Sequence, residues 1–187
     1  MRAGCVVLAA VLAVASQAFA LDIEGVKLAE KATVGGQELL LNGAGVRKRA
    51  IFKVYVGSLY LPAKASSAQE VLGKAPRRIQ LNVLRNLSSD QLIGALMDGL
   101  KQNLSAAEMQ ALTVQTGELA AIMKSFGEAK EGSVVTLDFV DDATKIGLDG
   151  TARGSVGGAA FNDALTRIWI GEHPVQADLR KAMLGGA

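Results

Sequence analysis

Three consecutive cations, Arg47, Lys48 and Arg49, form the part of this sequence best suited to binding an anion. Alternation along a strand would point Arg47 and Arg49 to one face and Lys48 to the other. A guanidinium that faces the interior needs an anionic partner, such as a carboxylate or an enolate oxygen. Tyr55 and Lys53 share a face of the following strand residues, so the Tyr55 phenol could donate to the same oxygen. The alternative interpretation, which spacing alone favours, is a solvated basic edge that blocks strand pairing.

Other residue sets that could carry chemistry are incomplete. His173 is the only histidine and Cys5 the only cysteine, so a zinc site or a nucleophile–base pair lacks partners. The acidic residues in 138–149 do not have the spacing of a calcium loop. The glycines in 154–158 precede a helix but lack the strand–helix–strand context of a dinucleotide site. We therefore predict neither a metal ion nor a cofactor.

Hydrophobic periodicity indicates which elements would position these residues. Strands are expected at residues 26–29, 38–41, 46–61, 77–85, 133–140, 145–148 and 151–156, with a bend in 46–61 after the basic run, a turn at 42–45 and a hairpin turn at Asp149-Gly150. Helices are expected at residues 66–72, 89–104, 105–126, 161–170 and 177–184, the first three beginning with the capping boxes Ser66/Gln69, Ser88/Gln91 and Ser105/Glu108. Because strands are grouped apart from helices, the pattern predicts an α+β fold with a large antiparallel sheet covered on one face by helices.

The first twenty residues have the features of a secretion signal. Arg2 precedes an apolar run at residues 5–15, and Ala18-Phe19-Ala20 has small residues where a signal peptidase reads them. The run is shorter than the ~20 residues of a membrane span. We expect cleavage after Ala20, a single domain at residues 21–187 and a periplasmic location, with secretion beyond the envelope as the alternative.

Composition argues against a nucleic-acid partner. The formal charge is only +2 and aromatic residues make up 4% of the chain. A nucleic-acid-binding surface needs a dense basic face, and a single-strand binder also needs aromatic side chains on which bases stack. Protein partners leave no readable pattern.

Three segments, in the same order, resemble the chalcone isomerase family. Residues 41–47 resemble the glycine-rich start of a family strand that ends in its key arginine, here Arg47. Residues 53–61 look like the next family strand, and residues 170–180 resemble the C-terminal motif. The resemblance implies a helix-covered antiparallel sheet with a ligand cleft between the two layers. Plant enzymes of this family cyclise a chalcone to a flavanone.

The resemblance also implies roles for individual residues. The family's strand threonine falls on Tyr55, its helix tyrosine near Leu92 and its helix asparagine near Gly99, so two polar groups that assist the reaction are replaced. Its pocket-lining pair falls on Ile168 and Trp169. The resemblance therefore implies that the family's signature reaction is lost.

The combination of Arg47 and Tyr55 is more similar to the fatty-acid-binding branch, in which both residues hold a carboxylate above an apolar tunnel. The resemblance gives as ligand-binding residues Arg47, Tyr55, Lys53, Leu92, Leu96, Ile168 and Trp169. The leading hypothesis is an exported, non-catalytic protein that binds a fatty acid or similar apolar carboxylate. One alternative is an isomerase or intramolecular lyase acting on an enone, with Arg47 stabilising an enolate and Tyr55 moving a proton. The other is a structural or interaction module of the envelope that has no ligand.

Overall fold

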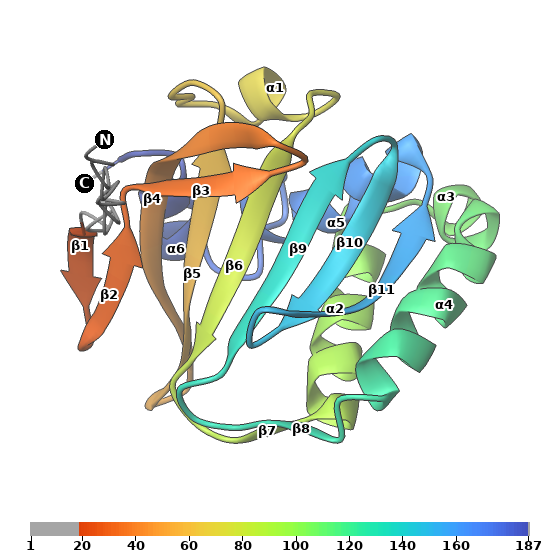
Figure 1. The fold of residues 1–187 in the computed structure, drawn as a ribbon. Coiled ribbons are helices and arrows are strands. Elements are labelled where there is room, and N and C mark those ends of the chain that lie inside the picture. Colours follow the sequence, from red (N-terminus) through yellow and green to blue (C-terminus); the bar gives the residue numbers. More distant parts are fainter. Residues whose placement is uncertain (1–18, 187) are drawn as a thin grey trace, which may run out of the picture.

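The computed structural model describes residues 19–186, and its main feature is a curled antiparallel sheet (Figure 1). The strands are β1 (Phe19–Ile23), β2 (Val26–Ala29), β3 (Lys31–Val34), β4 (Gln37–Arg49), β5 (Phe52–Leu61), β6 (Arg77–Val83), β7 (Leu87–Ser88), β8 (Glu128–Ala129), β9 (Val134–Val140), β10 (Ala143–Leu148) and β11 (Thr151–Gly157). Seven of them form the sheet, in the order β11-β10-β9-β6-β5-β4-β3. The other four form two small pairs, β1 with β2 and β7 with β8.

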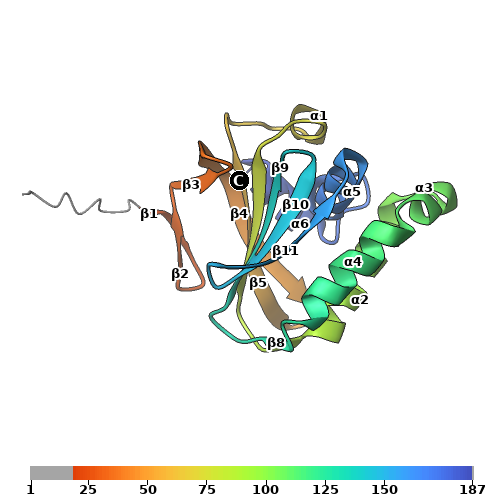
Figure 2. The ribbon, with the colours of Figure 1, turned by 45° about the vertical axis from the view of Figure 1, so that its right-hand side comes forward.

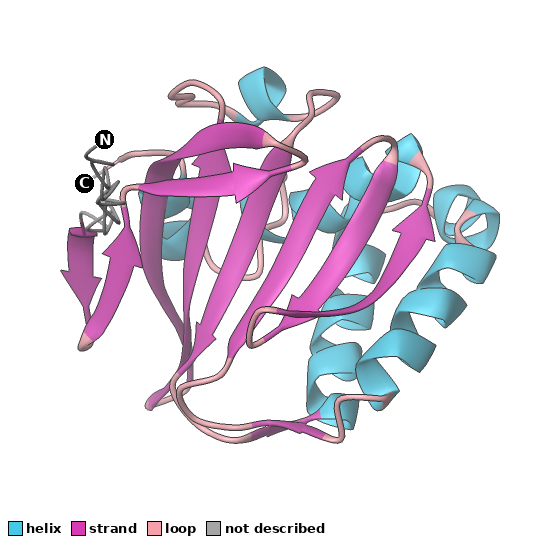
Figure 3. Ribbon diagram, viewed as in Figure 1, coloured by secondary structure: helices cyan, strands magenta, loops and turns pink. Residues whose placement is uncertain are grey.

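Helices cover one face of this sheet. They are α1 (Ala68–Val71), α2 (Ser89–Asn103), α3 (Ala106–Ala111), α4 (Thr113–Lys124), α5 (Ala159–Ile170) and α6 (Ala177–Met183). Figures 2 and 3 show α2, α4, α5 and α6 on the same side of the strands, while α1 lies at the rim. The α+β fold that the sequence predicts, an antiparallel sheet with helices on one face, is confirmed. Within residues 19–186, no helix combines the length and hydropathy needed to cross a bilayer.

The hydrophobic core lies mainly between the sheet and the helix layer. Alternate residues of β6 are buried along its whole length, as expected for a strand with one apolar face. They pack against the apolar sides of α2, α4 and α5. A second, smaller cluster lies on the opposite face of the sheet, around Leu28, Leu39, Val56 and Tyr60.

The turn expected at residues 42–45 is wrong, because β4 continues through this stretch without interruption. Glycines are needed here because α6 packs directly on the strand. A Cβ at Gly43 would lie 2.0 Å from the Ala182 carbonyl oxygen, and one at Gly45 would lie 2.8 Å from Ala182 Cβ. The Asn42 side chain bonds to the backbone of Ala65 and Met183, so it holds neighbouring segments together. Glycines that normally indicate a turn therefore mark close helix–strand packing.

The strand-like stretch expected at residues 46–61, with a bend after the basic run, consists of two strands, because the chain reverses fully at Ala50–Ile51 and forms the β4–β5 hairpin. Ala50 has a φ of 51°, the left-handed conformation that alanine rarely adopts. The turn has neither the glycine nor the asparagine that usually reveals such a reversal. By contrast, Asp149 and Gly150 adopt left-handed conformations with φ values of 52° and 75°, and the hairpin predicted between β10 and β11 is confirmed.

Two helix predictions need correction, one in its interior and one at its start. The helix expected at 105–126 is interrupted at Leu112, which has φ −100° and ψ 13°. The Thr113 hydroxyl donates to the Gln110 carbonyl at 2.8 Å, a side-chain bond that competes with regular helix geometry. The cap of α1 is Ser67, which accepts from the Glu70 amide, and not Ser66. Strand β3 was not predicted at all. The capping boxes at Ser88 and Ser105 are confirmed.

The expected signal segment falls almost wholly outside the described residues. Phe19 and Ala20 belong to β1, where Phe19 pairs with Ala29 in an irregular register. Cleavage after Ala20 would remove these two positions and leave the regular pairs from Leu21 to Ile23. Cleavage there is therefore compatible with the β1–β2 pair.

Candidate ligand-binding site

Arg47 and Tyr55 are direct cross-strand partners in the β4–β5 hairpin. Opposite residues of an antiparallel pair project their side chains to the same face. Tyr55 packs against the core between the sheet and the helices, so both side chains point toward the helix layer. The sequence-based expectation that a phenol stands next to a guanidinium agrees with this pairing. The register shifts between Arg47 and Lys48, so the strand changes its alternation just beyond the pair.

Gln176, the N-cap residue of α6, positions the β4 backbone around Arg47. Its side-chain oxygen accepts from the Lys48 amide at 2.9 Å and from Arg47 Nη1 at 3.3 Å. Its side-chain nitrogen donates to the Val46 carbonyl at 3.2 Å. Its amide therefore bonds to the β4 backbone on both sides of Arg47, next to the point where the register shifts. Nothing in the sequence indicates this role, because Gln176 only precedes the helix expected at residues 177–184.

Trp169 of α5 covers the Tyr55 hydroxyl. Its indole Nε1 donates to Tyr55 Oη at 3.0 Å, and its side chain is only 2% exposed. Burial raises the pKa of Tyr55 to about 12, although the Trp169 hydrogen bond and the nearby Arg47 charge lower it. At neutral pH the phenol therefore keeps its proton. Tyr55 is consequently suited to donate a hydrogen bond to an anion and poorly suited to act as a base.

The aliphatic candidates belong to the main core, between the sheet and the helices, against which Tyr55 packs. Leu92 and Leu96 are on the buried side of α2, and Ile168 lies on α5 next to Trp169. A Cβ at Gly99 would lie 2.7 Å from Ile168 Cγ2. The asparagine that the resemblance assigns near this position would therefore collide with Ile168. A shallow crevice between α2 and α4, lined partly by Leu96, borders the same layer and is too narrow to hold a water molecule.

Lys53 does not join the pair. Its ammonium forms an ion pair with Glu24 Oε2 at 2.5 Å, at the turn between β1 and β2. Half of the Lys53 side chain is exposed. Lys53 therefore lies in a solvated ion pair, where we expect it to contribute little to a buried anion site.

The expectation that no metal is bound rested on the single histidine. In the part of the chain that the structure describes, no group of three or more His, Cys, Asp or Glu side chains could hold a metal ion. His173 is exposed, and its main chain bonds to the Asn103 side chain.

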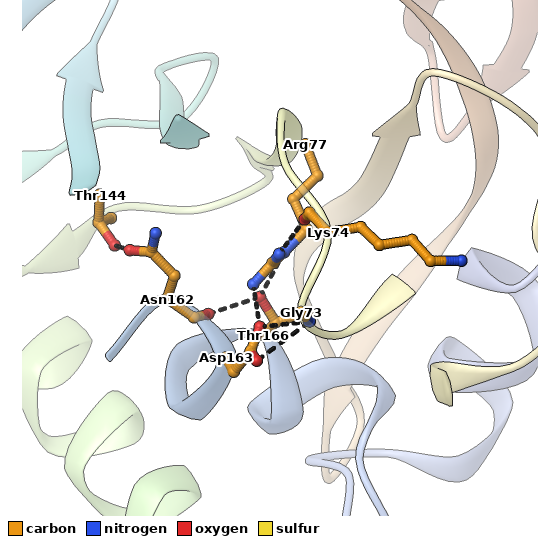
Figure 4. A network of polar contacts seen from close by, with 7 residues as sticks. All are labelled: Gly73, Lys74, Arg77, Thr144, Asn162, Asp163 and Thr166. Atoms are coloured by element: carbon orange, nitrogen blue, oxygen red, sulfur yellow. Dashed lines mark hydrogen bonds and ion pairs between the residues drawn. The ribbon is translucent and has the colours of Figure 1, made fainter. Parts of the chain in front are cut away.

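A buried polar network that was not predicted from the sequence joins β6 to α5 (Figure 4). Arg77 is 2% exposed, and its Nη2 lies 2.7 Å from Asp163 Oδ1. Its Nε donates to Thr166 Oγ1 at 3.0 Å, and its guanidinium lies 4.8 Å from the centre of the Phe139 ring. Asp163 also accepts from the Gly73 amide at 3.0 Å. This network fixes α5, the helix that carries Ile168 and Trp169.

The two tyrosines of the chain should ionise unusually late. Burial raises the pKa of Tyr55 to about 12 and also raises that of Tyr60. A tyrosine pKa raised by folding stabilises the folded state below the unfolded value near pH 10, and this contribution is lost as pH rises through the folded value. Tyrosinate absorbance of the folded protein should therefore stay low at pH 10 and rise together with unfolding. A full tyrosinate signal near pH 10 in protein with native circular dichroism would contradict this. Tyr55→Phe should leave only the contribution of Tyr60 to this rise.

Two comparisons relate this fold and site to known proteins. The chalcone isomerase-like family model matches residues 20–185. A search of curated protein sequences finds no match. The crystal structure of an Arabidopsis thaliana fatty-acid binding protein is similar with a TM-score of 0.61 and 16% sequence identity, over 83% of this chain and 96% of that one. That likeness supports the fold, while the family match covers nearly all of the described residues. The chain therefore belongs to the chalcone isomerase-like family.

Proposed function

We propose that this protein is a non-catalytic binder of a fatty acid or similar apolar carboxylate. The carboxylate would accept hydrogen bonds from Arg47 and Tyr55, and the tail would lie between the sheet and the helix layer. The pairing of a guanidinium with a protonated phenol across β4 and β5 is the observation that carries the proposal. Such sites are concave and apolar with a few polar anchors. The similar Arabidopsis structure, a fatty-acid binding protein, supports the same ligand class.

The proposal requires Trp169 to move. Its indole occupies the hydrogen-bonding position on Tyr55 that a carboxylate would take. A change of the Trp169 rotamer would free the phenol and open a path along Leu92 and Leu96. Trp169 therefore acts as the cover of the proposed site. It is the only tryptophan in the chain, so its fluorescence reports directly on ligand entry.

The remaining parts of the proposal concern catalysis and location. The crowding of Gly99 by Ile168 and the raised pKa of Tyr55 both argue against the family's signature reaction. Export through a cleaved signal at residues 1–20, to the periplasm, rests on the sequence pattern alone.

Decanoate and decanol offer a direct test, because they share an apolar tail and only decanoate has a carboxylate. We expect decanoate to shift Trp169 fluorescence and decanol to bind much more weakly. Arg47→Ala should lower decanoate affinity by about tenfold to a hundredfold, the usual effect of losing a hydrogen bond to a charged group. Arg49→Ala is the matched control, since Arg49 is exposed on the same strand, and it should bind normally. Equal affinity of Arg47→Ala and wild type would refute the anchor.

A second function, the ligand-free envelope module, is favoured by one observation, the tight cover of Tyr55 by Trp169. Native mass spectrometry of protein purified from its own host separates the two functions. A bound acidic lipid would support the binding protein. Protein without ligand, together with no response of Trp169 fluorescence to decanoate, would support the module.

A further inference from the structure

The turn between β4 and β5 exposes two adjacent large apolar side chains. Ile51 is 88% exposed, the highest value for any large apolar side chain of the described residues, and its neighbour Phe52 is 53% exposed. Figure 1 shows this hairpin at the lower end of the sheet, away from α1. The other exposed large apolar residues, Leu21 and Val114, lie singly on other elements. Single exposed apolar residues are normal, whereas an adjacent pair at a projecting turn calls for a partner.

Cations surround these two residues. Lys48 and Arg49 precede the turn and Lys53 follows it. The Arg85 guanidinium lies 4.5 Å from the centre of the Phe52 ring, a cation–π distance. One of these cations has an anionic partner, because Lys53 pairs with the Glu24 carboxylate. We call Ile51, Phe52 and these four cations the hairpin tip, and its balance of charge is strongly positive.

The chemistry of the hairpin tip fits the surface of an anionic bilayer better than it fits a protein. At such a surface, apolar side chains enter the boundary of the acyl chains while Lys and Arg stay among the phosphates. Each cation near an anionic leaflet strengthens binding by about fivefold. A stable protein interface instead needs a total buried area above about 1,000 Å², with lysine depleted from its centre. Two apolar side chains at the end of one hairpin cannot supply that area.

We propose that the hairpin tip docks this protein on membranes that contain anionic lipids. Ile51 and Phe52 enter the bilayer, and Lys48, Arg49, Lys53 and Arg85 contact the lipid phosphates. Because the tip residues are exposed and Arg47 is not among them, this docking does not depend on the proposed carboxylate site. If both proposals hold, the site lies on the same hairpin as the membrane contact, about 13 Å along the strand from Ile51.

Vesicle sedimentation of the protein as isolated from its host tests the docking. We compare vesicles of phosphatidylcholine alone with an equimolar mixture of phosphatidylcholine and phosphatidylglycerol. Wild-type protein should bind the mixed vesicles and bind them less as salt increases, because screening weakens the phosphate contacts. The double variant Ile51→Ser/Phe52→Ser and the double variant Lys48→Ala/Arg49→Ala should each lose at least about tenfold in vesicle affinity.

Matched controls separate the hairpin tip from general surface effects. Val114→Ser removes an exposed apolar side chain on α4, and Lys101→Ala with Lys124→Ala removes two exposed cations, one on α2 and one on α4. These controls should bind like wild type. Equal binding of wild type and the Ile51→Ser/Phe52→Ser variant would overturn the proposal. The proposal would also be overturned if the Ile51→Ser/Phe52→Ser variant changed only the self-association measured by sedimentation equilibrium. The hairpin tip would then contact a second copy of the chain and not a membrane. Decanoate binding should be unchanged in the hairpin-tip variants. This result would show that any loss of vesicle binding concerns membrane docking and not the carboxylate site.

Discussion

Replacing Asp163 by alanine is expected to lower the free energy of unfolding by about 3–5 kcal/mol, because it leaves the buried Arg77 guanidinium without its anionic partner. Arg77 is 2% exposed and Asp163 is 26% exposed, so solvent reaches the carboxylate but hardly reaches the guanidinium that the substitution leaves without a charged partner. The contacts that remain, to Thr166 Oγ1 and the Lys74 carbonyl, are neutral. Urea unfolding followed by Trp169 fluorescence measures the loss.

The control for this prediction is an ion pair on the surface. Lys31 and Glu38 form a pair at 2.7 Å in which both side chains are more than half exposed. Exposed pairs of this kind contribute little to stability. Lys31→Ala should therefore leave the urea midpoint almost unchanged. A loss for Asp163→Ala no greater than that of Lys31→Ala would mean that Arg77 reaches water, contrary to the structure.

Trp169→Ala is expected to have the second large effect. It should lower the stability of the protein and increase its affinity for decanoate. Removing a buried tryptophan lowers the free energy of unfolding by about 3–5 kcal/mol, through lost contacts and the cavity that remains. The same substitution exposes the Tyr55 hydroxyl and makes room beside Leu92 and Leu96. Decanoate affinity, measured by calorimetry because the fluorophore is gone, should therefore increase, and the ligand should recover part of the lost stability.

Trp169→Phe is the milder companion variant, since it keeps one aromatic ring while removing the indole N–H donor and part of the ring volume. It should cost less stability than Trp169→Ala and still free the Tyr55 hydroxyl. If decanoate binds the alanine variant no better than wild type, Trp169 does not cover the ligand path. If the alanine variant is as stable as wild type, the indole is not packed as described.

Much of the architecture could be predicted because alternation and capping are local properties. The buried alternation of β6 and the capping boxes at Ser88 and Ser105 depend on neighbouring residues only, and they were predicted from sequence. Arg77 could have been found by the same logic, because it has the same parity as the inward-facing Ile79 and Leu81. A cation in phase with buried residues indicates a buried ion pair, even though its partner, Asp163, cannot be located from spacing.

The errors concern residues whose role depends on distant segments. Gly43 and Gly45 were interpreted as a turn because glycine is common in turns. These positions are glycine because α6, a segment far along the chain, packs against them, and this contact cannot be read from the local sequence. Gln176 has no local sign of binding the β4 backbone. The pairing of Arg47 with Tyr55 was expected from the basic run and the resemblance. The hydrogen bond by which Trp169 covers the Tyr55 hydroxyl was not expected. Hydrogen bonds to the backbone of distant segments and close packing of small residues leave no periodic pattern.

The close packing of α6 on β4 also has a consequence for folding during synthesis. The Asn42 side chain is 4% exposed and donates to the Met183 carbonyl at 2.8 Å, across 141 positions of sequence. The ribosome makes β4 early and α6 late. The glycine-containing face of β4 therefore stays exposed to solvent until the intervening residues have been made. Contacts between such distant residues also form slowly, because a long loop must close first. The covering of this face of β4 is thereby tied to the synthesis of residues 177–183.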